Sequence, residues 1–563
     1  MLPTRMISEL KIYQPNSHTK MLASELSCPE LAAGVLEMLK GGEDIDTLRD
    51  WIRPDFTKQM ESLDLGKGSR AARDLWNSKS SFGNVLVYGD YDTDGISSTV
   101  LAMEIFRNKA AQVRYFIPRR DVHGYGLNAD VLDKVAGLGC NTLIVTDCGT
   151  NDSEMLQKLA KIGINIFVFD HHSLSAPITI PTIVNPCINM EAGDHQKICA
   201  TAVLWCWAWK ENIVPRDFLR YEVDLVTLAT IADCMPLHNL NRMLVREGMR
   251  LMRRNPRRGL AALFDCLSIN KSQLSEEHLS MRVIPCLNAP GRIATADTGV
   301  RALLGNGSND AVYSCVNDLM RVNRKRQTLT ENIAHEIDDG IITGRIKRKV
   351  IYNEQWPIGV LSGVASRICA QYNRPIVLAA PTGSTLIRGT LRVPEGGDAV
   401  GILRKISGKL DAWGGHKFAA GFSVLTQNWH EVRDDLERML ADIVIEPEGV
   451  TPVINIIPSD ITISDWRAVS ELGPFGNNNP SPKFYTDNNP RGLEINAMGK
   501  DGKHSFVRVN NAKLLAFNTP PHDVAELVGK GLKGWIYHPR LDYWRNEEQL
   551  QFILDCAVTE GGI

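Results

Sequence analysis

The stretch VYGDYDTDGISS, residues 87–98, decides the fold. Asp90, Asp92 and Asp94 occupy alternate positions in it, and Gly95 follows at once. An apolar run precedes the aspartates and a helical pattern follows them, which predicts a buried strand, an acidic loop and a helix. Three carboxylates so close in sequence repel one another, and this electrostatic cost favours a loop that binds cations.

Two further segments repeat this order of strand, polar cluster and helix. Residues 142–146 (TLIVT) precede Asp147, and residues 164–169 (INIFVF) precede the Asp-His-His cluster at 170–172. Short β-branched runs that alternate with helices predict a parallel sheet with both faces covered. Ligands bind such sheets beyond the carboxyl ends of the strands, where all three polar clusters fall.

The remaining sequence predicts an α/β protein with two cores and a barrel. A long charged helical pattern at 308–340 leads to a second α/β stretch, and after about residue 450 short strands alternate with Gly, Asn and Pro turns. The last pattern is typical of a small β-barrel. We expect five regions: an N-terminal helical region (1–75), a first core (76–305), a connecting helix (306–345), a second core (346–448) and the barrel (449–563).

Composition indicates a globular protein without a membrane span. Hydrophobic content of 44% and charged content of 23% are ordinary for such a protein. The longest uncharged apolar stretch, Ile198–Trp209, is too short to span a bilayer and predicts a buried helix. The N-terminus lacks the apolar core of a signal peptide. The twelve cysteines are scattered without a CxxC pair, which predicts a reducing, cytoplasmic setting.

Positive charge is concentrated in three clusters although the formal net charge is only −2. Residues 242–258 hold seven arginines, and the other clusters lie at 321–326 and 345–349. Each cluster taken alone is more often a solvated face. As a set they could follow a polyanion.

The acidic and imidazole side chains suggest a two-metal site. Mixed carboxylate and imidazole ligation suits Mn²⁺ or Mg²⁺, and two ions need several carboxylates to hold them. Along an extended loop alternate residues face one way, so Asp92 and Asp94 can point into one site. Each residue alone could instead cap a helix or satisfy a turn, but their joint occurrence in one α/β frame favours metal binding. The candidates are Asp90, Asp92, Asp94, Asp147, Asp170, His171, His172 and Asp233.

Four motifs resemble the acidic motifs of the DHH phosphoesterase superfamily in order and spacing. They are GDYDTDG (89–95), TDCG (146–149), DHH (170–172) and ADCMPL (232–237). Three more segments resemble one branch, the RecJ-type single-stranded-DNA exonucleases. These are IPCLNAPGRI (284–293), GGHKFAAGFSV (414–424), which is similar to the Gly-Gly-His motif of the DHH-associated domain, and ELGPFGNNNPSPKF (471–484). The likeness covers about residues 25–560.

The resemblance implies a fold and a set of roles. The fold is a parallel-sheet DHH core and a DHH-associated core joined by a long helix, followed by an OB-type barrel that binds nucleic acid. Two Mn²⁺ or Mg²⁺ ions would be bound by Asp92, Asp94, Asp147, His171 and Asp233, with Asp90 and His172 in close support. Asn288 and Arg292 would hold the scissile phosphate, and His416 would reach the same or the terminal phosphate. Candidates for further contacts with the DNA backbone are Arg367, Arg388 and Arg392.

The sequence departs from the family pattern in three places. The second core has Trp356-Pro357 where the family usually has Trp-His, and residues 389–393 read GTLRV where the family has Gly-Ser-x-Arg-Ser. Both changes bear on recognition of the strand end rather than on metal chemistry. The segment ICATAV, residues 198–203, lacks the glycines expected from relatives.

The implied function is an exonuclease that degrades single-stranded DNA, 5′→3′, to mononucleotides in DNA repair and recombination. Implied partners are single-stranded DNA, helicases and single-strand-binding protein, and we expect a monomer. Two alternatives stay open: a DHH-type phosphodiesterase of short oligonucleotides or cyclic dinucleotides, and a non-catalytic replication scaffold. The barrel argues against the first alternative, and the intact acidic motifs argue against the second.

Overall fold

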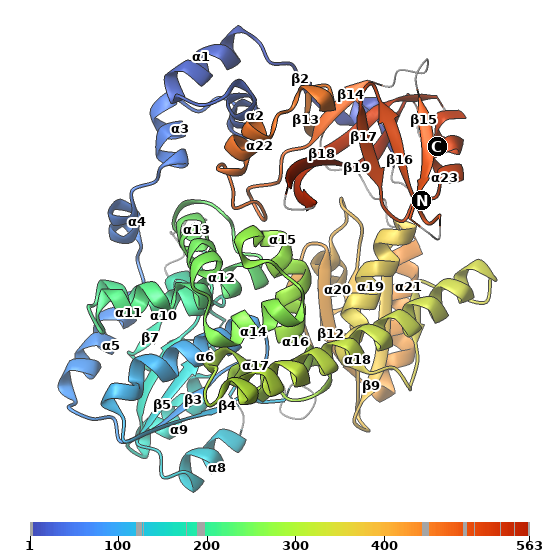
Figure 1. Cartoon of the computed structure of the whole chain (residues 1–563). Coiled ribbons are helices and arrows are strands. Elements are labelled where there is room, and N and C mark those ends of the chain that lie inside the picture. Colours follow the sequence, from blue (N-terminus) through green and yellow to red (C-terminus); the bar gives the residue numbers. More distant parts are fainter. Residues whose placement is uncertain are drawn as a thin grey trace. The chain divides into compact units, whose positions relative to one another are not determined.

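The computed structural model describes residues 4–560, except for 120–125, 128, 176, 189–196, 442–449, 488–492, 500–501, 530 and 545–546. The chain divides into two compact units (Figure 1). One unit comprises Met1–Glu61, Pro236–Arg246 and Gly449–Ile563, and the other comprises Ser62–Met235 and Glu247–Glu448. Within the described ranges, no helix is both long and apolar enough to cross a membrane.

The first core of the second unit is built on a five-stranded parallel sheet. Its strand order is β4-β3-β5-β6-β7. The three apolar runs expected to be strands are β3, β5 and β6, and β5 is buried along its whole length, as a strand covered on both faces should be. The strands are β3 (Asn84–Tyr88), β4 (Gln112–Phe116), β5 (Thr142–Thr146), β6 (Asn165–Phe169) and β7 (Ile183–Val184).

The strand order creates an opening at the carboxyl edge of this sheet. Strand β3 has β4 on one side and β5 on the other, so the chain reverses its direction of winding at β3. The loops that leave β3 and β5 therefore diverge, and a crevice for a ligand forms between them. The aspartate loop follows β3 and Asp147 follows β5.

Helices cover both faces of this sheet. On one face α6, α10 and α12 pack together, and Phe167 of β6 lies against Trp207 of α10 with ring centroids 6.2 Å apart. The other face is covered by α8 and α9. The helices of this core are α5 (Lys67–Ser78), α6 (Thr93–Phe106), α8 (Asp130–Gly137), α9 (Ser153–Lys161), α10 (Ala200–Lys210), α11 (Arg216–Tyr221), α12 (Val223–Ala232), α14 (Arg258–Cys266), α15 (Glu276–His278), α16 (Ile284–Ile293) and α17 (Asp297–Leu304).

The predicted connecting helix is α18 (Asn309–Ile342), and it leads into a second five-stranded sheet. The order of this sheet is β11-β12-β10-β9-β8, in which only β8 and β9 are parallel. Helix α19 packs on one face of β9, and α20 and α21 pack on the other face of the sheet. The elements are β8 (Val350–Tyr352), α19 (Ile358–Tyr372), β9 (Ile376–Thr382), β10 (Leu386–Arg392), α20 (Ala399–Lys405), β11 (Ala412–His416), β12 (Ala419–Leu425) and α21 (Trp429–Ala441).

The C-terminal strands have the order of an OB-type fold. They run β15-β16-β17-β19-β18-β14, and β17 pairs with β19 in parallel. The first strand of the fold is divided between β14 and β15, and no ladder in the described residues joins these two strands into a closed barrel. The elements are β13 (Thr451–Asn455), α22 (Ile463–Ser470), β14 (Phe484–Asp487), β15 (Glu494–Met498), β16 (His504–Val509), β17 (Ala512–Ala516), α23 (Pro521–Gly529), β18 (Leu532–Trp544) and β19 (Glu547–Thr559).

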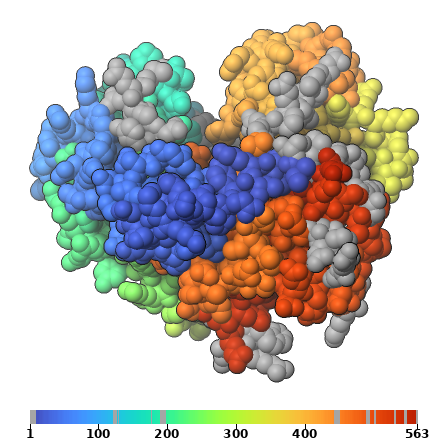
Figure 2. Space-filling view, turned by 90° about the horizontal axis from the view of Figure 1, so that it is seen from above, coloured from blue at the N-terminus to red at the C-terminus, as the bar shows by residue number. Residues whose placement is uncertain are grey.

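The N-terminal region contains the expected helices and, in addition, two short strands. Strand β1 pairs with β19 and β2 pairs with β13, so the blue N-terminal segment lies against the orange and red C-terminal segment in Figure 2. These strands have three and four residues, too few for a clear alternation of polar and apolar residues. The elements are β1 (Thr4–Met6), β2 (Leu10–Tyr13), α1 (Ser17–Leu26), α2 (Glu30–Lys40), α3 (Ile45–Ile52) and α4 (Phe56–Ser62).

The arginine-rich run at 242–258 is largely structural. Arg242, near the start of α13 (Asn239–Arg254), is buried with its guanidinium 4.1 Å from the centre of the Trp51 ring. It donates hydrogen bonds to the backbone carbonyls of Trp51 and Leu472. Arg257 pairs with the buried Asp224 at 2.7 Å. These guanidiniums satisfy buried acceptors, so they are not available to a polyanion.

Candidate metal centre and phosphate-binding face

The aspartate loop turns tightly into α6. Asp92 is the N-cap of this helix, and its Oδ1 accepts hydrogen bonds from the backbone N–H groups of Asp94 (3.0 Å) and Gly95 (3.1 Å). A Cβ at Gly95 would lie 2.4 Å from the carbonyl oxygen of Asp90, so only glycine fits there. The loop is therefore not extended as the alternating pattern suggested. Asp94 lies in the first turn of the helix and turns away from Asp90 and Asp92.

Asp147 lies in an unusual backbone conformation directly after β5. Its φ is 61°, in the left-handed region, and Gly149 follows with a φ of 102°. A left-handed conformation at a residue other than glycine costs about 1 kcal/mol or more and is often found at functional sites. The turn directs the Asp147 carboxylate into the cluster, where the residue is 2% exposed.

His171 and Asp233 approach Asp147 from two other segments. The Nε2 atom of His171 lies 3.3 Å from a carboxylate oxygen of Asp147 and 3.3 Å from one of Asp233. No hydrogen bond from this buried nitrogen is found in the described residues. Asp233 is the C-cap of α12, where the negative end of the helix dipole repels a carboxylate. A cation between these side chains would offset that repulsion.

The ligand atoms form three overlapping groups. In each group the atoms lie within 4.8 Å of one another, and Asp147 belongs to all three. Two ions about 3.5–4 Å apart commonly share a carboxylate in this way. The oxygen-rich donor set with one imidazole fits Mn²⁺ or Mg²⁺. Two of the groups are Asp94, Asp147, His171 and Asp233, here called the histidine subsite, and Asp90, Asp92 and Asp147, here called the aspartate subsite. The third group combines Asp147 with His171 and His172.

The electrostatics of the cluster favour the binding of cations. Burial and the neighbouring aspartates raise the pKa of Asp147 well above its ordinary value. Burial raises the pKa of Asp233 to about 9, and the charges of Asp94 and Asp92 add to the shift. Burial lowers the pKa of His171. Without cations these carboxylates retain protons, which divalent ions would displace on binding.

Asp170 holds the two histidines in position. Its carboxylate accepts hydrogen bonds from the backbone N–H groups of Thr150 (3.0 Å) and His171 (2.7 Å), and it lies 2.7 Å from Nδ1 of His172. Although burial opposes ionisation, the His172 contact keeps the pKa of Asp170 below its ordinary value. The same contact raises the pKa of His172. Such acceptors commonly orient the ligands of a metal site.

The end of α16 lies against the aspartate loop. The Oδ1 atom of Asn288 accepts a hydrogen bond from the Thr93 hydroxyl at 2.7 Å. A Cβ at Gly291 would lie 2.5 Å from the carbonyl oxygen of Tyr91, so this glycine permits a close approach. Arg292, the next residue, is exposed beside the acidic cluster.

Arg292 also connects the two cores. Its Nη1 donates a hydrogen bond to the Ser362 hydroxyl of α19 at 3.0 Å. A Cβ at Gly359 would lie 1.9 Å from the carbonyl oxygen of Arg292, so α16 and α19 are in direct contact. The metal cluster and the second core are therefore joined through the end of α16.

One face of the second sheet carries positive side chains above a floor of small residues. Residues directly opposite one another in neighbouring strands point to the same face. The register therefore aligns Arg392, Ala419 and His416 in one row across β10, β12 and β11. The next two rows are Thr390, Gly421 and Gly414, and Arg388, Ser423 and Ala412. We call these nine residues the arginine–histidine face; Gly414, His416 and Gly421 on it are exposed.

Three guanidiniums gather where this face meets α16 and α18. Burial, together with the charge of Arg292, lowers the pKa of both Arg326 and Arg392. In the described residues these two donate only to uncharged acceptors, such as Asn323 for Arg326 and Ser366 for Arg392. An anion would relieve their mutual repulsion. Arg367 is exposed on α19 and makes none of these contacts.

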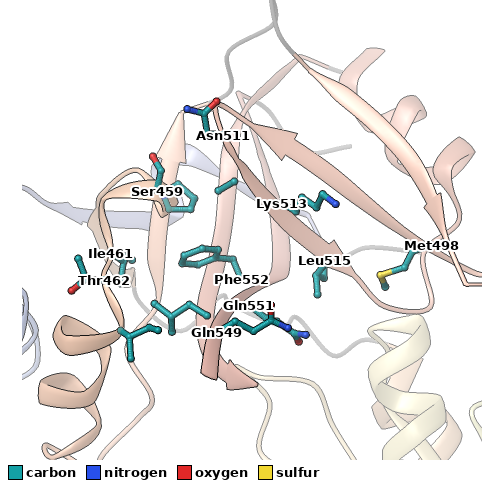
Figure 3. A pocket seen from close by; sticks show the side chains of 14 residues that line it. Ser459, Ile461, Thr462, Met498, Asn511, Lys513, Leu515, Gln549, Gln551 and Phe552 are labelled. Atoms are coloured by element: carbon teal, nitrogen blue, oxygen red, sulfur yellow. The ribbon is translucent and has the colours of Figure 1, made fainter. Parts of the chain in front are cut away.

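A separate cavity of about 750 Å³ lies in the OB-type domain (Figure 3). It opens between β17, the start of β19 and the segment that leads into α22. Phe552 forms part of its wall, and Lys513 is the charged residue of its lining. Polar side chains around it include Asn511, Gln549 and Gln551.

Some residues of these sites were not singled out from the sequence. Ser362 and Ser366 are one helical turn apart on α19 and meet two different arginines. Their spacing of four would have indicated a shared helix face. Thr201 contacts Asp94, which is 107 positions away in the sequence, and no local sequence pattern predicts such a contact.

Family models match three segments of the chain in order. They are described as the DHH family, N-terminal domain (residues 84–235), the DHHA1 domain (342–442) and the RecJ OB domain (454–555). The first spans the parallel sheet with all five aspartates and the histidine of the two subsites. The second spans the arginine–histidine face.

The chain is similar to curated and solved proteins over most of its length. The "Single-stranded-DNA-specific exonuclease RecJ" of Thermus thermophilus is 29% identical over 96% of this chain and 79% of the relative. A crystal structure of RecJ in complex with Mn²⁺ from the same organism has a TM-score of 0.78 at 23% identity, covering 99% of this chain and 81% of that one. A structure of exonuclease RecJ bound to manganese has a TM-score of 0.55 at 27% identity, covering 68% of this chain and 96% of that one.

Proposed function

Because the chain belongs to the RecJ-type branch of the DHH family, we propose that it is a metal-dependent exonuclease of single-stranded DNA that hydrolyses phosphodiester bonds from the 5′ end to mononucleotides. The observation that carries this proposal is the pair of subsites that share Asp147 at the carboxyl edge of β3 and β5. The named activity of the relatives and the OB domain support single-stranded DNA as the substrate.

The metal centre performs the hydrolysis. When bound, two divalent cations supply the Lewis acidity that lowers the pKa of an attacking water and offsets the charge on the phosphate oxygens. One cation would be held by Asp94, Asp147, His171 and Asp233, and the other by Asp90, Asp92 and Asp147. Asp170 fixes the orientation of His171 and His172. Although burial opposes it, the contact with Asp170 raises the pKa of His172, which favours the protonated imidazole as a donor to a phosphate oxygen.

The arginines hold the DNA backbone beside this centre. Asn288 and Arg292 contact the scissile phosphate, since they lie at the aspartate loop. Arg392 contacts the adjacent phosphate, because a guanidinium matches phosphate oxygens in a two-pronged geometry. The glycines of the arginine–histidine face let the sugar–phosphate chain approach the sheet closely. His416, Arg388 and Arg367 contact phosphates further along or the terminal one.

The OB-type domain contributes to binding of the single strand. Such domains combine positive charge with surfaces on which bases stack. The cavity next to Lys513 provides an apolar wall, a cation and several amide side chains in one place. These features suit a nucleotide, whose base is apolar on its faces and polar on its edge.

The wider setting of the enzyme rests on its likeness to RecJ-type relatives. We propose that it works as a monomer in the cytoplasm, in DNA repair and recombination, beside helicases and single-strand-binding protein. The described residues contain no disulfide bond, which supports a reducing compartment.

Comparison of substrates tests the proposal. We would incubate the protein and Mn²⁺ with a long single strand, the matching duplex and a dinucleotide at equal concentrations of ends. The proposal predicts that the single strand is degraded much faster than the duplex. If only the dinucleotide is cut, the chain is a phosphodiesterase of short substrates and the proposal is wrong. If nothing is cut, the chain is a scaffold.

A further inference from the structure

Asp94 is the most enclosed carboxylate of the metal centre. Its side chain is 0% exposed, and burial raises its pKa. An ionised carboxylate buried in this way needs hydrogen-bond donors to be stable. They come from a segment that is distant in sequence, the first turn of α10.

Three donors of this turn bind the Asp94 carboxylate. The backbone N–H of Ala200 donates to Oδ2 at 2.7 Å. The backbone N–H of Thr201 donates to Oδ1 at 2.8 Å, and the Thr201 hydroxyl lies 2.6 Å from the same oxygen. The hydroxyl is also 3.1 Å from the backbone carbonyl of Asp94. Both oxygens of one carboxylate are thus held by two consecutive residues.

Asp94 acts as the N-cap of α10. The first N–H groups of a helix have no partner within the helix, and they form the positive end of its dipole. The residue at the N-cap position, Cys199, makes no capping hydrogen bond with its side chain. The carboxylate of Asp94 takes that place. Helix α10 is buried from Ala200 to Ala208, so its N-terminal end has little access to water. The contact gives hydrogen-bond partners both to the N–H groups of the helix and to the Asp94 carboxylate.

These hydrogen bonds leave one oxygen of the Asp94 carboxylate able to accept a further partner. Each carboxylate oxygen can accept about two hydrogen bonds. In the part of the chain that the structure describes, Oδ1 already faces two donors, whereas Oδ2 faces one. Oδ2 is also the oxygen that lies 3.8 Å from Nε2 of His171, in the histidine subsite. Only Oδ2 therefore remains to bind a cation, and its position is set by α10.

We propose that Thr201 is a positioning residue of the metal centre, which fixes Asp94 so that it binds the cation of the histidine subsite through Oδ2 alone. This inference rests on the proposed metal-dependent function. Thr201 lies in ICATAV, the segment that differs from the glycine-containing pattern expected of relatives. Among the described residues, its hydroxyl is the one side-chain donor to Asp94, so it can be removed without disturbing the helix backbone.

The aspartate subsite provides an internal reference. Its Asp92 carboxylate is held by the first turn of a different helix, α6, and not by α10. Loss of the Thr201 hydroxyl should therefore weaken one cation site and leave the other nearly unchanged. A general loss of stability would weaken both sites.

The test measures Mn²⁺ binding to the full-length protein without DNA, by calorimetry and by electron paramagnetic resonance. The variants are Thr201→Val, which keeps the shape and loses the hydroxyl, and Thr201→Ser, which keeps the hydroxyl. Removing a group that orients a metal ligand typically costs about 10- to 100-fold in affinity. We expect Thr201→Val to weaken one of two Mn²⁺ sites by about tenfold or more and Thr201→Ser to stay within about twofold of wild type.

Three outcomes would overturn the inference: both sites unchanged in Thr201→Val, both weakened equally, or Thr201→Ser as weak as Thr201→Val. The Tm in EDTA identifies a variant that fails to fold. If Thr201→Val does not fold, the Mn²⁺ affinities of Thr201→Ser and wild type are compared instead. The proposed function fails separately. If wild-type protein binds two Mn²⁺ ions but does not cut single-stranded DNA, the nuclease proposal is wrong while the role of Thr201 still follows from the binding data.

Discussion

The Nε2 atom of His171 lies 3.3 Å from a carboxylate oxygen of Asp147, although the two residues follow different strands of the sheet. Strands β5 and β6 are neighbours and parallel, so their carboxyl ends meet at one edge. The carboxylate of Asp147 belongs to both cation subsites, whereas the imidazole of His171 belongs to the histidine subsite of the two. Substitution of Asp147 should therefore affect both ions.

Asp147→Asn should abolish cleavage and leave DNA binding in place. Loss of a shared ligand removes several kcal/mol of transition-state stabilisation, which corresponds to about a thousandfold in rate. The affinity for single-stranded DNA should change by less than about threefold, because the arginines and the OB-type domain carry it. Single-turnover cleavage and filter binding measure the two quantities.

The matched control for Asp147 is Asp152→Asn. Asp152 is a largely buried acid of the same core, its pKa is also raised by burial, and it belongs to neither subsite. Its variant should cut DNA at nearly the wild-type rate. Near-normal turnover by Asp147→Asn would refute the two-cation assignment.

The metal-free protein should become less stable as the pH rises. Burial raises the pKa of Asp233 to about 9 and that of Asp147 well above its ordinary value. A carboxyl of this kind holds a proton in the fold that the unfolded chain has already released above about pH 4. The unfolded state then binds fewer protons, so stability falls with rising pH between about 4 and 9.

Thermal denaturation in EDTA between about pH 5 and about pH 8 measures this effect. The raised pKa of His172 acts in the same direction, whereas the lowered pKa of His171 acts in the opposite one. Asp233→Asn should make the decline in Tm shallower. Mn²⁺ should raise the Tm more at the higher pH, because it displaces the retained protons. A Tm in EDTA that rises across this range would contradict the assignment.

Arg392→Gln should weaken DNA binding and reduce its dependence on salt. Each phosphate contact on a single strand contributes about 0.7 to the slope of log K against log salt concentration. We expect that slope to fall by about 0.7 in the variant. Arg438→Gln is the control, since Arg438 is exposed on α21, which packs against the other face of the same sheet. Equal slopes for Arg392→Gln and wild type would exclude a phosphate contact at Arg392.

Gly421→Val should block DNA binding without unfolding the protein. The nearest atom to a Cβ at Gly421 is 3.7 Å away, so the side chain fits and rises from the floor of the arginine–histidine face. Gly389→Val is the contrasting variant, because a Cβ there would lie 2.2 Å from the Phe422 ring in the core. We expect a wild-type Tm and weak binding for Gly421→Val, and a lowered Tm for Gly389→Val. Normal DNA affinity of Gly421→Val would show that the strand does not cross this face.

The OB-type domain is better tested by substitution than by truncation. Its core includes Leu31, Val35 and Leu36 of α2, and β2 extends its sheet, so removal of the residues after about 450 would expose the N-terminal helices. Lys513→Glu instead reverses the charge beside the cavity. We expect weaker binding of long strands and an unchanged cleavage rate on very short oligonucleotides. An effect independent of strand length would argue against a DNA contact there.

Much of the architecture followed from local patterns. The runs NVLVY, TLIVT and INIFVF are short and apolar on both faces, which predicted parallel strands, and the polar residue after each run predicted the site. The OB-type order of the C-terminal strands was harder to predict from the sequence. It depends on the parallel pairing of β17 with β19, which a helix and a strand separate along the chain. Strands β1 and β2 were missed because segments of three or four residues carry too little pattern.

The sequence did not predict which aspartate contacts which helix and which cation subsite. Alternation suggested that Asp92 and Asp94 share one direction, but α6 begins at Thr93 and rotates Asp94 towards α10. Which acid meets which helix depends on contacts more than a hundred positions apart, as between Asp94 and Thr201. The arginine cluster at 242–258 differs from both readings of its charge, a solvated face or part of a polyanion track, since Arg242 and Arg257 in it bind backbone carbonyls and a buried carboxylate.

The most direct measurement of the central claim is cleavage of one long single strand labelled at either end, with Mn²⁺ and with Asp147→Asn as the inactive control. We predict that the 5′ label is released at once as a mononucleotide, while the 3′ label remains on fragments that shorten progressively. Release of the 3′ label first, internal fragments, or no cleavage by wild-type protein that has bound two Mn²⁺ ions would contradict a 5′→3′ two-metal exonuclease.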